Sequence, residues 1–231
     1  MTSRVAHRAL RSGRRTTALA LAVVSVPVLL AVTSVALAAA LRDPPAPSAP
    51  PAPYAGWQTV EGDGASYRVP ADWELHPPDE RVGYRDDAGR VRARGAALST
   101  YRGNDCPGGV RHPGAWAALA DPVRARDTAA VATAAARQWA RGFGTSDAGT
   151  ARTGRPRVAT LERADGRPAV AATVTLDLHG LDNPCGEVTA ELSVLAARDG
   201  AVVRLLVLGR HPDVAGAVDD ARTRQILRSL T

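Results

Sequence analysis

Lysine is absent from this chain of 231 residues, and all 29 basic residues are arginines. A phosphate-binding loop of the P-loop type needs a lysine after its glycines and a strand before them. The stretch GFGTSDAG at 142–149 has neither, so it is expected to be a connection. The Gly-x-Ser-x-Gly motif of hydrolases and the His-Glu-x-x-His motif of metalloproteases are also absent. We therefore predict that the chain is not an enzyme.

Acidic residues are missing from the first 42 positions. These positions hold six of the arginines: Arg4, Arg8, Arg11, Arg14, Arg15 and Arg42. From Asp43 onward, the remaining 23 arginines face 23 acidic residues. The net charge of +6 and the pI near 10.3 thus come from the N-terminal tail. Nucleic acid is not an expected partner of the folded part, because nucleic-acid binding needs a basic surface there.

Charge is absent between Arg15 and Arg42, where residues 16–41 read TTALALAVVSVPVLLAVTSVALAAAL. As a helix this segment would be about 39 Å long, against a hydrocarbon core of about 30 Å. We predict a transmembrane signal anchor over 16–41, with the basic tail 1–15 in the cytoplasm. A cleaved signal peptide is the alternative, because Ala36-Leu37-Ala38 and Ala38-Ala39-Ala40 fit the cleavage pattern. Either topology makes the rest of the chain extracytoplasmic. The signal anchor places the protein at the cell membrane, whereas cleavage would give a secreted form of the same domain.

A linker rich in proline and alanine follows at 42–55. It contains six prolines, which favour the extended polyproline II conformation. The remaining residues, 56–231, are enough for one domain with a sizeable core.

Cysteine occurs only twice, at Cys106 and Cys185, each in a loop of turn-forming residues after a predicted strand. Cysteines of an exported domain usually pair, so we predict a Cys106–Cys185 disulfide. A catalytic thiol would need a base, for which His112 is the nearest candidate. Zinc would need three or four ligands at characteristic spacing, which two isolated cysteines and scattered histidines do not supply. No metal or cofactor is expected.

Alternating apolar residues predict strands in the first half of the domain, at 57–61 and 65–70. A hairpin is predicted over 81–103, turning at Asp86-Asp87-Ala88-Gly89. A helix is predicted over 127–143, capped by Asp127 or Thr128. Its expected core stripe is Val131, Ala135 and Trp139, which recur at i, i+4.

The second half is predicted to contain two further hairpins, turning at Asp165-Gly166 and at Asp199-Gly200. A last helix is expected to open at Pro212-Asp213 and to bury Ile226, Leu227 and Leu230. This order predicts an α+β domain, with an antiparallel sheet of about six to eight strands flanked by two main helices.

Several short motifs carry a resemblance. They are YRVPADW at 67–73, VGYRDDAGR at 82–90, GNDCPGG at 103–109, NPCGE at 183–187 and RQILRSL at 224–230. On these motifs, residues 57–231 resemble the extracytoplasmic domain of unknown function of actinobacterial single-pass or secreted proteins. That domain is similar to the PsbP-type α/β/α sandwich. The resemblance implies a fold and brings no catalytic residues.

Five arginines in the first predicted hairpin are the candidate binding residues: Arg81, Arg85, Arg90, Arg92 and Arg94. Alternate residues of a strand project from one face, so these side chains are expected to form a surface for an anionic partner. The simpler interpretation is a solvated outer face, partly neutralised by Asp86 and Asp87.

The composition and motifs together predict a binding module in the cell envelope, whose partner is a protein, a polymer or a lipid. One alternative is a carrier or sensor of a lipid or small apolar molecule, which needs an apolar pocket of several hundred Å³ between helix and sheet. An enzyme would need two of His76, His112, His179, His211 and the carboxylates to share a cleft.

Overall fold

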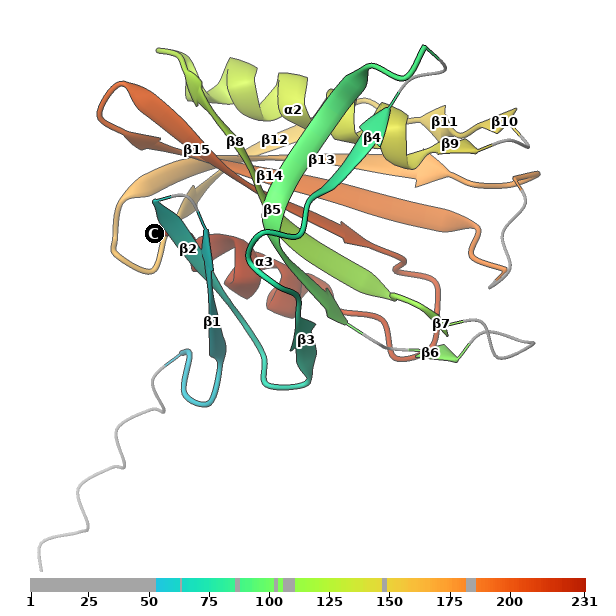
Figure 1. Cartoon of the computed structure of the whole chain (residues 1–231), viewed down its shortest axis with the longest axis horizontal. Coiled ribbons are helices and arrows are strands. Elements are labelled where there is room, and N and C mark those ends of the chain that lie inside the picture. Colours follow the sequence, from blue (N-terminus) through green and yellow to red (C-terminus); the bar gives the residue numbers. More distant parts are fainter. Residues whose placement is uncertain are drawn as a thin grey trace, which may run out of the picture. The chain divides into compact units, whose positions relative to one another are not determined.

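The computed structural model describes residues 53–62, 64–85, 88–101, 104–105, 111–146, 149–181 and 186–231. The predicted transmembrane segment, most of the linker and both cysteines lie outside these residues. The described part is an α+β domain with two helices and mostly antiparallel strands, as predicted (Figure 1). No helix in this part of the chain is long and apolar enough to cross a membrane.

Nine strands of the described residues form the main sheet, one more than the upper end of the prediction. Their order is β11-β13-β14-β15-β8-β5-β3, with β12 pairing with β13 and β4 with β5. These strands are β3 (Trp73–Leu75), β4 (Val82–Arg85), β5 (Val91–Tyr101), β8 (Ala115–Arg124), β11 (Arg152–Thr153), β12 (Arg157–Glu162), β13 (Pro168–Asp177), β14 (Thr189–Asp199) and β15 (Val202–Arg210). Every neighbouring pair is antiparallel.

Short hairpins lie beside the main sheet. The first is β1 (Gln58–Gly62) with β2 (Ala65–Val69), as predicted from the alternation of apolar residues. The others are β6 (Asn104–Asp105) with β7 (Arg111–His112), and β9 (Thr145–Ser146) with β10 (Gly149–Thr150).

The predicted hairpins of the main sheet are confirmed. β4 pairs with β5, β12 with β13, and β14 with β15. Gly166 and Gly200 have φ angles of 79° and 60°. Such angles are readily available only to glycine, which explains why Asp-Gly marks both turns.

Strand β8 is not predicted by the sequence pattern, although it lies at the centre of the sheet between β15 and β5. Its sequence, AWAALADPVR, is rich in alanine, which favours helix in isolation, and it contains proline. Small side chains are suited to this position because both faces of the strand are covered. Ala117 packs on one face and Trp116 and Ala118 on the other.

One helix covers each face of the sheet (Figure 1). Helix α2 (Thr128–Phe143) packs on the face that carries Val203, Leu205 and Val207 of β15. Helix α3 (Asp220–Arg228) and the β1–β2 hairpin cover the opposite face, which carries Leu206 and Leu208. Among the described residues, both clusters are built within this domain, so the domain has a hydrophobic core of its own, as is typical of a unit that folds by itself.

Helix α2 begins where predicted, because the Asp127 side chain accepts a hydrogen bond from the Ala130 backbone N–H at 2.9 Å. Helix α3 begins at Asp220 and not at Pro212-Asp213. The carboxylate of Asp213 instead accepts bonds from the backbone N–H groups of Val188 and Thr189, at 2.8 and 2.9 Å. Asp219 serves as the N-cap of α3.

Candidate functional site

The candidate site is a groove along α2, formed by two adjoining cavities between this helix and the neighbouring strands. The first, here called the apolar cavity, has a volume of about 560 Å³. Its apolar lining consists of Val91, Ala93, Ala120, Val123, Val131, Ala134, Ala135, Trp139 and Leu205. Arg92, Arg94, Asp121 and Gln138 complete the lining.

Small side chains leave this space open. Val131, Ala134 and Ala135 lie at i, i+3 and i+4 on one stripe of α2, and Ala93 and Ala120 face them from the strands. Val91 and Val123 at the rim are 47% and 39% exposed. Both belong to the few large apolar side chains that are exposed among the described residues, so the groove presents apolar surface to solvent.

The stripe predicted to be the core of α2 packs against the core and also borders this groove. The fully buried residues of the helix are Ala132, Ala136, Trp139 and Ala140, whereas Val131 and Ala135 are half-buried. Trp139 belongs both to the predicted stripe and to the buried residues of the helix. Its ring lies 5.5 Å from that of Trp116 and 5.7 Å from that of Tyr84, which it meets edge to face.

The second cavity, here called the arginine cavity, has a volume of about 670 Å³. It is lined by Tyr84, Arg85, Arg92, Gln138, Arg141, Gly142, Thr145 and Thr150. Arg92 and Gln138 line both cavities, so the two cavities are neighbours along α2, and together they are here called the α2 groove.

Glycine 142 allows this end of the groove to form. A Cβ atom at Gly142 would lie 2.4 Å from Cγ of Tyr84, so only glycine lets the Tyr84 ring pack against the helix. Burial raises the pKa of the Tyr84 phenol above 10.0.

Three arginines contribute to the lining of the arginine cavity: Arg85, Arg92 and Arg141. Arg85 also donates to the Gly89 carbonyl at 2.9 Å. In the lining of the apolar cavity, the Arg94 guanidinium is paired with the Asp121 carboxylate.

The structure distributes the five predicted arginines over different places, although all five are exposed. Arg85 and Arg92 line the arginine cavity, and Arg92 and Arg94 line the apolar cavity. Arg90 precedes β5 and lines neither. A register shift between Tyr84 and Arg85 interrupts the alternation of side chains between the two faces of the hairpin, and the five arginines do not all line the same cavity.

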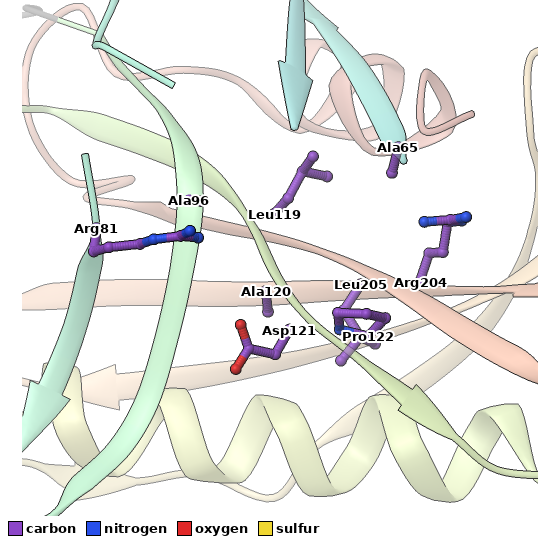
Figure 2. Close-up of a pocket in the computed structure, with 9 residues that line it drawn as sticks. All are labelled: Ala65, Arg81, Ala96, Leu119, Ala120, Asp121, Pro122, Arg204 and Leu205. Atoms are coloured by element: carbon purple, nitrogen blue, oxygen red, sulfur yellow. The ribbon is translucent and has the colours of Figure 1, made fainter. Parts of the chain in front are cut away.

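Arg81 lies on the other face of the sheet, in a pocket of about 30 Å³ with Ala65 of β2. Figure 2 shows Arg81 and Arg204 at opposite sides of this pocket, with Asp121 between them. Its volume is about that of one water molecule. We therefore do not regard it as a ligand site.

The histidines lie apart from the α2 groove. His76 contacts Glu80 at 3.2 Å, and His179 contacts Asp177 at 2.6 Å, both near the surface. His211 is buried beside Phe143. Only the backbone of His112 is described. Within the described residues, no group of three or more histidine, cysteine or acidic side chains is arranged to hold a metal ion.

Several candidate residues fall outside the described part of the chain. They are Cys106, Cys185, Asp86 and Asp87, so the predicted disulfide and the turn carboxylates stay predictions. Within GFGTSDAG, the described residues form the end of α2 and the short strands β9 and β10, as expected for a connection.

Sequence reasoning did not identify the contribution of α2 to the site. Gln138 and Arg141 continue the helical spacing of the stripe that begins with Val131, Ala134 and Ala135, which was a usable signal. That stripe turns from apolar at Val131 to basic at Arg141. Such a gradient is unusual for a stripe that only packs into a core.

Comparison with curated proteins gave no match. A domain of unknown function, DUF8017, matches residues 50–231. This range covers most of the chain and the entire described domain, including every residue of the α2 groove. The chain therefore belongs to the DUF8017 family.

Proposed function

We propose that this protein is a membrane-anchored ligand-binding module of the cell envelope, and that the α2 groove is its binding site. The observation that carries the proposal is the apolar cavity of about 560 Å³ between helix and sheet. This volume lies in the range of small-molecule sites, about 300–1,000 Å³. The carrier or sensor function required such a pocket. A general binding surface on the arginine hairpin has less support, because its arginines are divided between places.

The cellular setting is part of the same proposal. Residues 16–41 would hold the protein in the membrane, with the domain outside and joined by the linker 42–55. A Cys106–Cys185 disulfide would suit that compartment. A relationship to the PsbP-type sandwich of actinobacterial proteins is supported by the placement of one helix on each face of the sheet. Cell fractionation tests the anchor. We expect the full-length chain in the membrane, and a form that begins only near Ala39 or Leu41 would contradict it.

Binding of a neutral apolar probe tests the groove. N-phenyl-1-naphthylamine should bind residues 50–231 saturably and at one site, as measured by its fluorescence. Ala134→Trp should abolish this binding, because Ala134 lines the apolar cavity and is exposed, so the indole fills the cavity without disturbing the core.

Arg137→Trp is the matched control. Arg137 is exposed on the same helix and lines neither cavity, so this variant should bind the probe as the wild type does. Absence of saturable binding, or equal loss in both variants, would refute the proposed site.

A further inference from the structure

We propose that the free edge of strand β12 pairs with the same edge of a second copy of this chain, so that two domains share one continuous antiparallel sheet. This pairing does not depend on the ligand of the α2 groove. One side of β12 (Arg157–Glu162) pairs with β13, and no strand of the described residues pairs with its other side. A free edge of this kind presents backbone N–H and C=O groups that another strand can bind.

The register of β12 identifies the polar groups on its free side. The backbone N–H of Arg163 donates to the Arg167 carbonyl at 2.9 Å, so this pair belongs to the hydrogen-bond ladder with β13. Along an antiparallel strand, residues that bond to one neighbour alternate with residues that face the other side. The backbone groups of Val158, Thr160 and Glu162 therefore point away from β13.

Most of these backbone groups are open to a partner. The Glu162 carbonyl accepts a hydrogen bond from Nε of Arg228 at 2.5 Å, which agrees with a direction away from β13. The N–H and C=O groups of Val158 and Thr160, and the N–H of Glu162, bond to no residue in the described part of the chain. The edge thus offers both donors and acceptors to a second strand.

The edge also lacks the usual protection against pairing. Exposed sheet edges are commonly protected by very short or irregular strands, by prolines and by charges. The opposite edge of the main sheet has such features, because β3 has three residues and β4 has a register shift. Strand β12 is a regular strand of six residues, RVATLE, with charges only at its ends. Arg157 leans back over the sheet, where it donates to the Glu191 carboxylate at 3.2 Å.

An exposed apolar side chain lies on the same strand. Val158 is 51% exposed, more than the other large apolar side chains that are exposed in the described part of the chain. A strand laid along the edge would cover part of this side chain, which adds an apolar contribution to the backbone hydrogen bonds.

A second copy fits the edge because the edge is complementary to itself. Val158 and Glu162 lie equally far from Thr160, so a two-fold axis beside Thr160 brings donors to acceptors. Each Thr160 N–H would bond the opposite Thr160 carbonyl, and each Glu162 N–H the opposite Val158 carbonyl. Over 158–162 this pairing sets no two like charges opposite one another. The domains do not repel each other through net charge, since from Asp43 onward 23 arginines balance 23 acidic residues.

The symmetry has a consequence for the α2 groove. Because the paired strands continue one sheet, the two-fold axis stands perpendicular to that sheet. Both α2 helices would therefore lie on the same face of the joined sheet, and the two grooves would open on the same side of the dimer.

Sedimentation equilibrium of residues 50–231 tests the pairing. The average mass should rise with concentration from that of a monomer to that of a dimer, with a Kd of about 10–100 µM, as expected for a small interface. Thr160→Lys should weaken the dimer at least about tenfold, because like charges directly opposite each other destabilise paired strands. Thr160→Glu should do the same, and an equimolar mixture of the two variants should restore the dimer.

Thr59→Lys is the matched control, since Thr59 is also an exposed strand residue but lies on β1, outside the main sheet. It should leave the Kd unchanged. A monomer mass up to about 500 µM would overturn the proposal and leave the edge to a strand of another protein. Equal weakening by Thr59→Lys and Thr160→Lys, or a mixture that stays monomeric, would overturn the placement on β12. Species that grow beyond a dimer would overturn the two-fold pairing.

Discussion

Replacement of Tyr67 by phenylalanine tests how the centre of the sheet is held together. Tyr67 lies on β2, is fully buried, and directs its hydroxyl at an irregular part of β5. That hydroxyl lies 2.7 Å from the Ala97 carbonyl, 2.9 Å from the Ala117 carbonyl and 2.9 Å from the Ser99 hydroxyl. The β5–β8 register shifts between Ala96 and Ser99, so the sheet ladder does not pair Ala97 with β8. Ala97 has a φ of 51°.

Tyr67→Phe removes this hydroxyl and its single proton, so a buried carbonyl, that of Ala97 or Ala117, loses this donor. An unsatisfied buried group costs about 1–3 kcal/mol. With a urea dependence of about 2 kcal/mol per molar, the unfolding midpoint should fall by about 1 M. Urea unfolding followed by circular dichroism measures this shift.

Tyr101→Phe is the matched control, because the Tyr101 hydroxyl bonds to no described residue. This variant should change the unfolding free energy by less than about 0.5 kcal/mol. If the two variants shift the midpoint equally, the Tyr67 hydroxyl does not stabilise the irregular strand and the reasoning is refuted.

Four further outcomes are expected. Arg210→Met should lower the unfolding free energy by about 3–5 kcal/mol, as measured by urea titration. The side chain of Arg210 is 8% exposed and that of its partner Glu191 is 16% exposed, so the substitution leaves a mostly buried carboxylate without its main partner. A loss below about 1 kcal/mol would contradict this. Hydrogen bonding to Arg210 also lowers the pKa of Asp220 below 3.8, so stability from this pair should disappear as the pH falls through that range, and Arg210→Met should unfold with a shallower acid dependence. Burial raises the pKa of Tyr67 and Tyr84 above 10.0, so their contribution to stability should be complete below pH 10.0 and should decline as the pH rises further. Phenolate absorbance should show that both rings ionise only when the protein unfolds. Ionisation of either ring in the folded protein near pH 10.0 would argue against its burial. Mass spectrometry without reductant should find Cys106 linked to Cys185, whereas two alkylatable thiols would exclude the disulfide; closing a loop of about 80 residues contributes up to roughly 4–5 kcal/mol.

The hairpins could be predicted because their signals are local. Asp-Gly pairs at 165–166 and 199–200 need positive φ angles at glycine, and the flanking strands alternate clearly. The start of α3 could not be predicted in this way. Asp213 reads as a helix cap, but its carboxylate bonds to the backbone of a distant strand.

The site depended on how the elements pack. Strand β8 has a composition that favours helix, and its burial on both faces decides its conformation. The arginine pattern at period two predicted one face, and the register shift between Tyr84 and Arg85 interrupts the alternation across the hairpin in a way that the sequence does not show. The groove exists because the alanine stripe of α2 lies over alanines of β5 and β8, a coincidence of small residues that appears only when the elements meet.

Nuclear magnetic resonance titration of residues 50–231 with N-phenyl-1-naphthylamine tests the central claim most directly. The indole N–H of Trp139 and the backbone amides of Val131, Ala134 and Arg141 should shift progressively and saturably, because they border the α2 groove. The indole signals of Trp57 and Trp73 should stay in place, since both lie with the other core. Saturable shifts confined to Trp57 and Trp73, or no shifts at all, would contradict a binding site along α2.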